Sequence, residues 1–213
     1  MHYLFKVRWW MKLYSPFLTW RIPNRKREVF LTFDDGPNPG VTDEVLYILE
    51  KYKVKASFFC LGKNVEGNVE LFNEILKAGH VIGNHTYDHA DGWVSPNSRY
   101  SVSVNRCESV FGSQFFRPPY GKITPVQIKK LRKRFQIVMW SLLSGDFDEK
   151  LSPDKILEDL KNNTKTGDIV VFHDSIKAKN NLLQVLPAYL EFLNEKGFKC
   201  SVLRKRKRYF LFF

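Results

Sequence analysis

Short apolar runs alternate with longer amphipathic segments from residue 28 to near the end of the chain. An apolar run bounded by Gly, Pro or polar residues predicts a buried strand, and apolar residues spaced by three and four predict a helix with one buried face. Strands are predicted over residues 28–33, 56–61, 80–83, 114–116, 136–140, 168–172 and 198–203. Helices are predicted over residues 42–52, 68–78, 97–111 and 182–196, and two more begin at Thr124-Pro125 and Ser152-Pro153.

Strands that alternate with helices predict an α/β fold with a parallel sheet and right-handed crossovers. Closed on itself, a sheet of these seven strands is a (β/α) barrel, like the eight-stranded TIM barrel but smaller. The 213 residues are enough for one domain with a full core. We expect a basic, aromatic extension over residues 1–27, the folded domain over 28–203, and a basic, aromatic tail over 204–213.

Polar residues follow several of the predicted strands directly. They are Asp34 and Asp35 after the first strand, His85 after the third, Arg117 after the fourth, Asp146 after the fifth and His173 after the sixth. In a parallel barrel the carboxyl ends of the strands lie on one face, and that face carries the active site. These residues are therefore expected to converge.

Asp35, His85 and His89 form a candidate metal-binding set. On a helical turn, two histidines four residues apart place both rings on one face. Three protein ligands leave positions for water and substrate, as in catalytic metal sites. Zinc is the default metal, although cobalt, nickel and iron also accept imidazole ligands. The alternative, a pair of surface or capping histidines, is less favoured because Asp35 offers a carboxylate on the same face.

The remaining polar residues provide acid–base chemistry. Asp34, left off the metal, can act as a general base toward a metal-bound water, and Arg117 can hold it ionised and oriented. His173, from another strand, can serve as general acid, with Asp146 orienting its imidazole and raising its pKa. The backbone N–H of Tyr120 can complete an oxyanion site. Together these groups describe hydrolysis of an ester or amide without a covalent intermediate.

Four segments in this order resemble the polysaccharide deacetylases with the NodB-homology domain, carbohydrate esterase family four. They are Thr32–Pro37, His85–His89, Arg117–Gly121 and Val171–Asp174. The resemblance covers residues 29–202. It implies a deformed (β/α) barrel, zinc or another divalent ion, and removal of N- or O-acetyl groups from glycans. It also implies Asp34 as base, Asp35, His85 and His89 as metal ligands, Arg117 as the residue that orients the base, Tyr120 as oxyanion donor, and His173 as acid.

One motif departs from the family pattern. Leu143 stands where the family has an aspartate that contacts the arginine of the third motif, and Phe147 replaces a tryptophan. Arg117 is therefore expected to be held less firmly, or Asp148 to take over the contact. Val171 replaces the leucine that precedes the acid, which keeps an apolar acetyl pocket but changes its shape.

The formal net charge of +12 favours anionic partners. Residues before Glu28 carry seven Lys and Arg and no acid, and residues 204–208 are all basic. Peripheral contact of these basic, aromatic ends with an anionic membrane is one expectation. Nucleic acid is not expected, since no binding module is recognised. No continuous apolar stretch resembles a signal peptide or a spanning helix, so the expected location is cytoplasmic or peripheral at the membrane.

Three functions remain open. The leading one is a metal-dependent hydrolase that releases acetyl groups from a glycan or amino sugar. The alternative, motivated by Leu143, is a catalytically weak homologue that binds carbohydrate. A non-haem iron oxygenase shares the ligand set of two histidines and a carboxylate. The α/β alternation and the additional acid–base pair count against the oxygenase.

Overall fold

The computed structural model describes residues 17–205. Its strands are β1 (Leu18–Thr19), β2 (Glu28–Asp34), β3 (Ser57–Cys60), β4 (Val81–Asn84), β5 (Phe115–Phe116), β6 (Gln136–Val138), β7 (Leu142–Leu143), β8 (Ile169–His173) and β9 (Lys199–Cys200). Its α-helices are α1 (Thr42–Lys51), α2 (Gly62–Gly67), α3 (Val69–Lys77), α4 (Asn97–Val110), α5 (Pro125–Leu131), α6 (Pro153–Asn163) and α7 (Lys179–Glu195). A 3₁₀ turn, η2, spans Pro119–Gly121.

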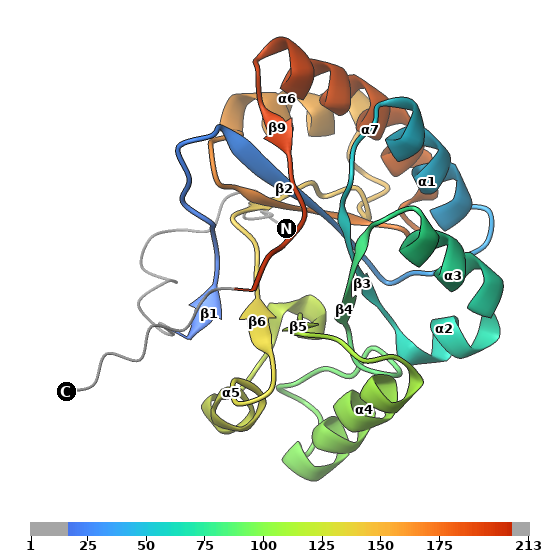
Figure 1. The fold of residues 1–213 in the computed structure, drawn as a ribbon, viewed down its shortest axis with the longest axis vertical. Helices are drawn as coiled ribbons and strands as arrows, with labels where there is room; N and C mark the ends of the chain where they lie inside the picture. The colour runs from blue at the N-terminus through green and yellow to red at the C-terminus, as the bar shows by residue number, and fades with distance from the viewer. Residues whose placement is uncertain (1–16, 206–213) are drawn as a thin grey trace.

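The strands form one curled parallel sheet in the order β1-β6-β5-β4-β3-β2-β8-β7, with β9 paired to the start of β2. Helices lie around the outside of the strands (Figure 1). The predicted deformed, TIM-like barrel is confirmed, and all seven predicted strands are present. The additional elements β1, β7 and α2 were not predicted, because such short elements carry too few residues for a periodic pattern.

The N-terminal segment is part of the barrel. Leu18 lies opposite Ile137 in the β1–β6 pairing, and Arg21 forms an antiparallel bridge with Asp168 at the start of β8. The Arg21 guanidinium also pairs with the Asp168 carboxylate. The sheet therefore takes in residues ahead of the predicted boundary at residue 28. Residues 1–16 of the predicted extension and 206–213 of the predicted tail lie outside the described residues.

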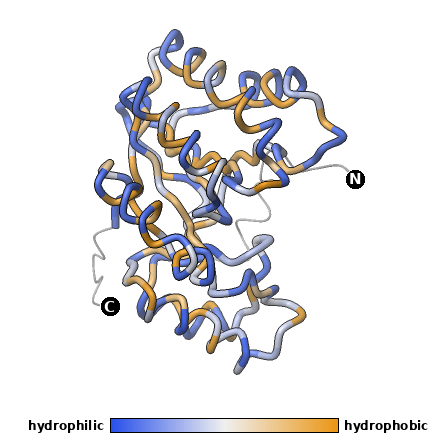
Figure 2. Tube along the Cα trace, turned by 90° about the vertical axis from the view of Figure 1, so that its right-hand side faces the viewer, coloured by the Kyte–Doolittle hydropathy of each residue, from blue (hydrophilic) through white to orange (hydrophobic). Residues whose placement is uncertain are grey.

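Hydrophobic and hydrophilic residues alternate along the helices (Figure 2), and a cluster of buried apolar residues joins the helices to the sheet. The ring of Phe33 on β2 stacks on Phe58 of β3 and Phe172 of β8, with centroids 5.0 and 5.9 Å apart. Tyr189 of α7 covers Phe172 from the helix side at 5.9 Å. Aromatic contacts of this kind fix neighbouring strands together.

Among the helices of residues 17–205, none combines the length and the hydropathy that a membrane-spanning helix needs.

Strand register brings the candidate residues to one edge of the sheet. Asp34 at the end of β2 lies opposite His173 at the end of β8 and opposite Phe59 of β3. Asn84, the last residue of β4, lies opposite Phe116, which directly precedes Arg117. The expected convergence at the carboxyl ends of the strands is therefore what the fold produces.

Candidate active site

The Asp34–Arg117 ion pair lies at the centre of the site. Oδ1 of Asp34 accepts a hydrogen bond of 2.6 Å from Nη1 of Arg117. Asp34 is 4% exposed and Arg117 is fully buried, so the pair is shielded from water. The other carboxylate oxygen, Oδ2, lies 4.0 Å from Nε2 of His85. One oxygen of Asp34 is thus held by the arginine while the other borders the histidines.

Arg117 is held without the aspartate that Leu143 replaces. Its guanidinium donates to the backbone carbonyls of Val138 (3.3 Å) and Met139 (3.0 Å), and to the hydroxyl of Thr32 (2.8 Å). It also lies 4.1 Å from the centre of the Phe59 ring. These contacts satisfy a buried cation that would otherwise be costly.

Asp148 does not take over the missing contact, which corrects that expectation. Its Oδ1 accepts from the backbone N–H of Lys150 at 3.1 Å, and no hydrogen bond joins it to Arg117 among the described residues. The backbone carbonyls after β6 had not been considered as partners for Arg117, since a sequence pattern does not identify which carbonyls remain unpaired.

Asp35, His85 and His89 converge as expected. Oδ1 of Asp35 lies 3.2 Å from Nε2 of His89 and 3.6 Å from Nε2 of His85, and the ligand atoms of all three lie within 4.8 Å of one another. Oδ1 of Asp35 is buried, yet it accepts no hydrogen bond within the described residues. A buried carboxylate oxygen facing two imidazole nitrogens fits a divalent cation, which would supply the missing partner.

The state of His85 fits a metal ligand. Its Nδ1 donates to the carbonyl of Arg117 at 2.8 Å, which leaves the lone pair of Nε2 directed toward Asp35. Burial lowers the pKa of His85 to about 4, so the ring is neutral near pH 7. A neutral imidazole is the form that binds metal. For Asp35, burial alone would raise the pKa, but the facing histidines hold it well below its ordinary value.

The segment that carries the two histidines is not a helical turn, which corrects the reason given for their convergence. Thr86 and His89 have φ angles of 68° and 59°, in the left-handed region. The side chain of Asn84 accepts from the N–H of Thr86 at 2.9 Å, and the hydroxyl of Thr86 accepts from the N–H of Ala90 at 3.0 Å. The loop is therefore shaped by local side-chain hydrogen bonds, and it brings the two rings to 5.2 Å.

His173 and Asp146 form a second pair. Nδ1 of His173 lies 2.8 Å from Oδ1 of Asp146. The other carboxylate oxygen of Asp146, Oδ2, accepts from the backbone N–H of His173, also at 2.8 Å. Phe147 packs edge-on against the imidazole at 4.9 Å. Burial alone would lower the pKa of His173, but the Asp146 carboxylate outweighs it and raises the pKa to about 9. The ring is thus protonated near pH 7 and directed by Asp146.

Tyr120 lies beside the histidine cluster. It has a φ of 58° inside η2, and its ring packs edge-on against His89 with centroids 4.5 Å apart. The side chain is 61% exposed, so it borders the open side of the site. The turn after β5 therefore places the Tyr120 ring beside His89.

Several supporting residues were missed from the sequence. Asp35 has a φ of 82°, and its carbonyl accepts from the amides of Asn64 (2.8 Å) and Asn38 (3.1 Å). Asn64 lies on the unpredicted helix α2. Fully buried Asp174 accepts from the N–H of Gly36 (3.0 Å) and the hydroxyl of Thr42 (2.6 Å). In the sequence, this network was indicated only by Asp174, the last residue of the segment Val171–Asp174 that resembles the family.

Gly36 is required by that network. A Cβ atom at this position would lie 1.9 Å from Oδ2 of Asp174, far inside contact distance. The glycine therefore lets the buried carboxylate approach the backbone directly after the two aspartates. This explains why the Asp34-Asp35 pair is followed by glycine.

Comparison with known proteins agrees with this geometry. The polysaccharide deacetylase family profile matches residues 21–139. The peptidoglycan-N-acetylglucosamine deacetylase of Bacillus cereus is 32% identical over 200 residues, which cover 91% of this chain and 94% of that protein. The chain therefore belongs to the polysaccharide deacetylase family of hydrolases.

Solved structures share the fold. The crystal structure of the peptidoglycan N-acetylglucosamine deacetylase Bc1960 matches with a TM-score of 0.84 at 31% identity, over 88% of this chain and 91% of that one. A mutant of BA3943, described as a family-four pseudoenzyme with restored enzymatic activity, matches with a TM-score of 0.79 at 26% identity. It covers 89% of this chain and 70% of that one. The same fold is thus found in a deacetylase and in a mutant of a protein described as a pseudoenzyme.

The contact between Asn64 and the Asp35 carbonyl generates a test. We expect Asn64→Ala to weaken zinc affinity by about tenfold, because partners that orient a ligand typically contribute that much. Asn68→Ala is the matched control, since the amide of Asn68 donates to the carbonyl of Asn64 and not to Asp35. Competition with a chromogenic chelator measures both. Equal zinc affinity in the two variants would contradict a role for Asn64 in positioning Asp35.

Proposed function

We propose that the chain is a metal-dependent hydrolase that removes N-acetyl or O-acetyl groups from a glycan or amino-sugar substrate. The observation that carries the proposal is that the adjacent carboxylates of Asp34 and Asp35 have different partners. Asp35 faces the two histidines with an unpartnered oxygen, while Asp34 is paired with Arg117. One aspartate is thus suited to bind a cation and the other to move a proton. We assign this activity to the domain predicted over residues 28–203.

Asp35, His85 and His89 are the residues that would hold the metal, with zinc the leading candidate and cobalt, nickel or iron the others. A bound divalent cation supplies a water of lowered pKa and polarises the acetyl carbonyl. Oδ2 of Asp34 takes a proton from the attacking water. Arg117 holds Oδ1 of Asp34 at 2.6 Å and thereby directs Oδ2 for that step.

His173 is the proposed acid. Its protonated ring can give a proton to the leaving amine or alkoxide when the carbonyl carbon–heteroatom bond breaks. Asp146 fixes the ring through Nδ1, so Nε2 carries the proton that is transferred. The backbone N–H of Tyr120 is the proposed donor to the developing oxyanion. The acetyl methyl group is proposed to lie against Phe147 and Val171. Phe147 packs on the His173 ring, and Val171 lies two residues before His173 on the same face of β8.

The catalytically weak carbohydrate-binding protein remains the second candidate, because of Leu143 and the pseudoenzyme structure that shares this fold. Against it, the buried Arg117 makes four hydrogen bonds without an aspartate at position 143. Both the proposed base and the proposed acid are present with their partners. Saccharide binding without release of acetate would favour this second candidate.

Release of acetate tests the leading proposal. We expect the full chain with zinc to release acetate from acetylated chitooligosaccharides, and a chelator to abolish the release. Asp34→Asn should lower the rate by about 10²–10⁴-fold, because a neutral amide cannot accept the proton. Coupled assay of acetate measures the rate, and circular dichroism checks that the variant is folded.

Asp159→Asn is the matched control for this test. Asp159 pairs with Lys155 at 2.9 Å on α6, and none of the proposed catalytic residues lies on that helix, so the rate of this variant should remain close to that of the unaltered chain. An unchanged rate in Asp34→Asn would exclude Asp34 as the base. Oxygen consumption in place of acetate release would instead favour the oxygenase.

The pH profile tests the acid. Since His173 must be protonated to act, activity is lost as pH rises through its pKa of about 9. Asp146→Asn removes the carboxylate that raises this pKa, so the alkaline limb of kcat/KM should move to lower pH. Asp148→Asn is the control: the Asp148 carboxylate accepts from the backbone N–H of Lys150, so its loss should leave the alkaline limb in place. An alkaline limb that does not move in Asp146→Asn would contradict the assignment of His173 as acid.

A further inference from the structure

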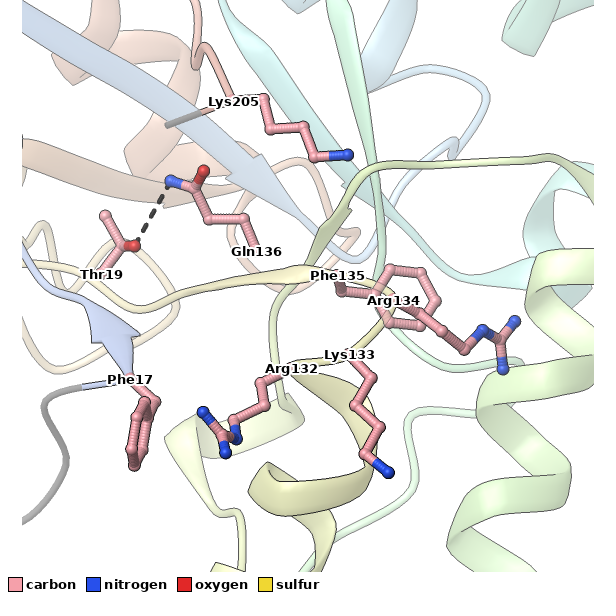
Figure 3. A pocket seen from close by; sticks show the side chains of 8 residues that line it. All are labelled: Phe17, Thr19, Arg132, Lys133, Arg134, Phe135, Gln136 and Lys205. Carbon is pink, nitrogen blue, oxygen red and sulfur yellow. Dashed lines mark hydrogen bonds between the residues drawn. The ribbon is translucent and has the colours of Figure 1, made fainter. Parts of the chain in front are cut away.

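A basic pocket lies away from the proposed active site. It has a volume of about 480 Å³ and is lined by Phe17, Thr19, Arg132, Lys133, Arg134, Phe135, Gln136 and Lys205. Four of these residues are cations and none is a carboxylate. Figure 3 shows Arg132 beside Phe17, with Lys133, Arg134 and Lys205 projecting in different directions and Arg134 directed toward α4, where it donates to Asn105. Such a concentration of one charge sign attracts an anionic partner.

The basic pocket lies at the amino end of the barrel. Phe17 directly precedes β1, and Arg132–Phe135 directly precede β6. Lys205 follows Leu203, whose N–H donates to the hydroxyl of Ser57 at the start of β3 (3.1 Å). The proposed catalytic residues follow the carboxyl ends of the same strands. A partner bound at the basic pocket would therefore leave the other end of the barrel accessible to substrate.

The pocket combines charge with an exposed aromatic ring. Phe17 is 53% exposed, and the guanidinium of Arg132 lies 4.1 Å from its centre. Phe135 is only 3% exposed, so Phe17 is the one ring among the lining residues that projects. Cations beside an exposed aromatic ring are typical of surfaces that bind at a lipid interface. A single-stranded nucleic acid would favour several rings in succession.

The sequence on both sides of the pocket has the same character. Phe17 is joined to residues 1–16, which contain three cations, two tryptophans and no acid. Lys205 is joined to residues 206–213, which read Arg-Lys-Arg-Tyr-Phe-Leu-Phe-Phe. Both segments lie outside the described residues, but each is connected to a residue that lines the pocket. Clusters of Lys and Arg with interleaved aromatic residues favour anionic phospholipid.

We propose that the basic pocket at the amino end of the barrel binds the phosphate head groups of an anionic membrane, with the ring of Phe17 at the lipid interface. The proposed active site then faces away from the membrane. This peripheral attachment does not depend on the hydrolytic chemistry. Membrane binding can therefore be tested separately from the proposed hydrolase activity.

Binding of the full chain to vesicles tests the proposal. Vesicles of equal parts phosphatidylglycerol and phosphatidylcholine should bind the chain, and vesicles of phosphatidylcholine alone should bind it far less. The pair Lys133→Gln and Lys205→Gln should weaken binding to the anionic vesicles by about twenty-five-fold, at roughly fivefold per cation removed. Sedimentation of the vesicles with the protein measures the partition coefficient.

The pair Lys150→Gln and Lys177→Gln is the matched control. It makes the same change to the net charge of +12, but both residues lie in loops at the carboxyl end of the barrel. Its partition coefficient should stay within about twofold of the unaltered chain, since distant charges are screened by salt. Equal weakening by both pairs, or no preference for anionic vesicles, would overturn the proposal.

Two further measurements separate lipid from other anions. Phe17→Ala should lower vesicle binding by about tenfold, because an aromatic ring gains free energy only on leaving water. Tighter binding of a single-stranded oligonucleotide than of the anionic vesicles at matched ionic strength would overturn the assignment to lipid. Release of acetate from soluble chitooligosaccharides should be unchanged in the Lys133→Gln, Lys205→Gln pair, and its loss would contradict the separation of the two ends.

Discussion

The buried guanidinium of Arg117 is the interaction on which the site depends. It donates to Thr32 and Asp34 on β2 and to the carbonyls of Val138 and Met139 at the end of β6. Because Arg117 itself directly follows β5, it joins the ends of three strands. Removing one partner of a buried ion pair costs about 3–5 kcal/mol, because the other charge is left unpaired in a medium that solvates it poorly. Arg117 therefore both stabilises the barrel and fixes the orientation of the Asp34 carboxylate.

The same arrangement separates the roles of two adjacent carboxylates. Side chains alternate across a strand, so Asp34 and Asp35 cannot both follow the regular strand geometry to the same point. Asp34 ends β2 and turns inward to Arg117, whereas Asp35 adopts a φ of 82° and faces the histidines. Asn38 and Asn64 hold the Asp35 carbonyl in this conformation. The positive φ at Asp35 is thus stabilised by hydrogen bonds from a neighbouring loop and helix.

Much of the fold and the site could be predicted from the sequence. The apolar strands are long enough to show a pattern, and a parallel sheet brings Asp34, His85, Arg117 and His173 to one edge whatever the details of the loops. The conformation of the loop from His85 to His89 could not be predicted, because Asn84, Thr86 and the distant Ser103 determine it through hydrogen bonds. The two-residue strand β1 was missed because two residues are too few to show a period, although it pairs with β6 and buries Leu18.

The most direct test of the account is a crystal structure of the chain grown with zinc, with anomalous diffraction recorded at the zinc edge. The account predicts one peak at about 2.0–2.2 Å from Asp35 and from Nε2 of both His85 and His89, with Asp34 still paired to Arg117. A peak bonded to Asp34 in place of Asp35, or zinc bound only away from the two histidines, would contradict it.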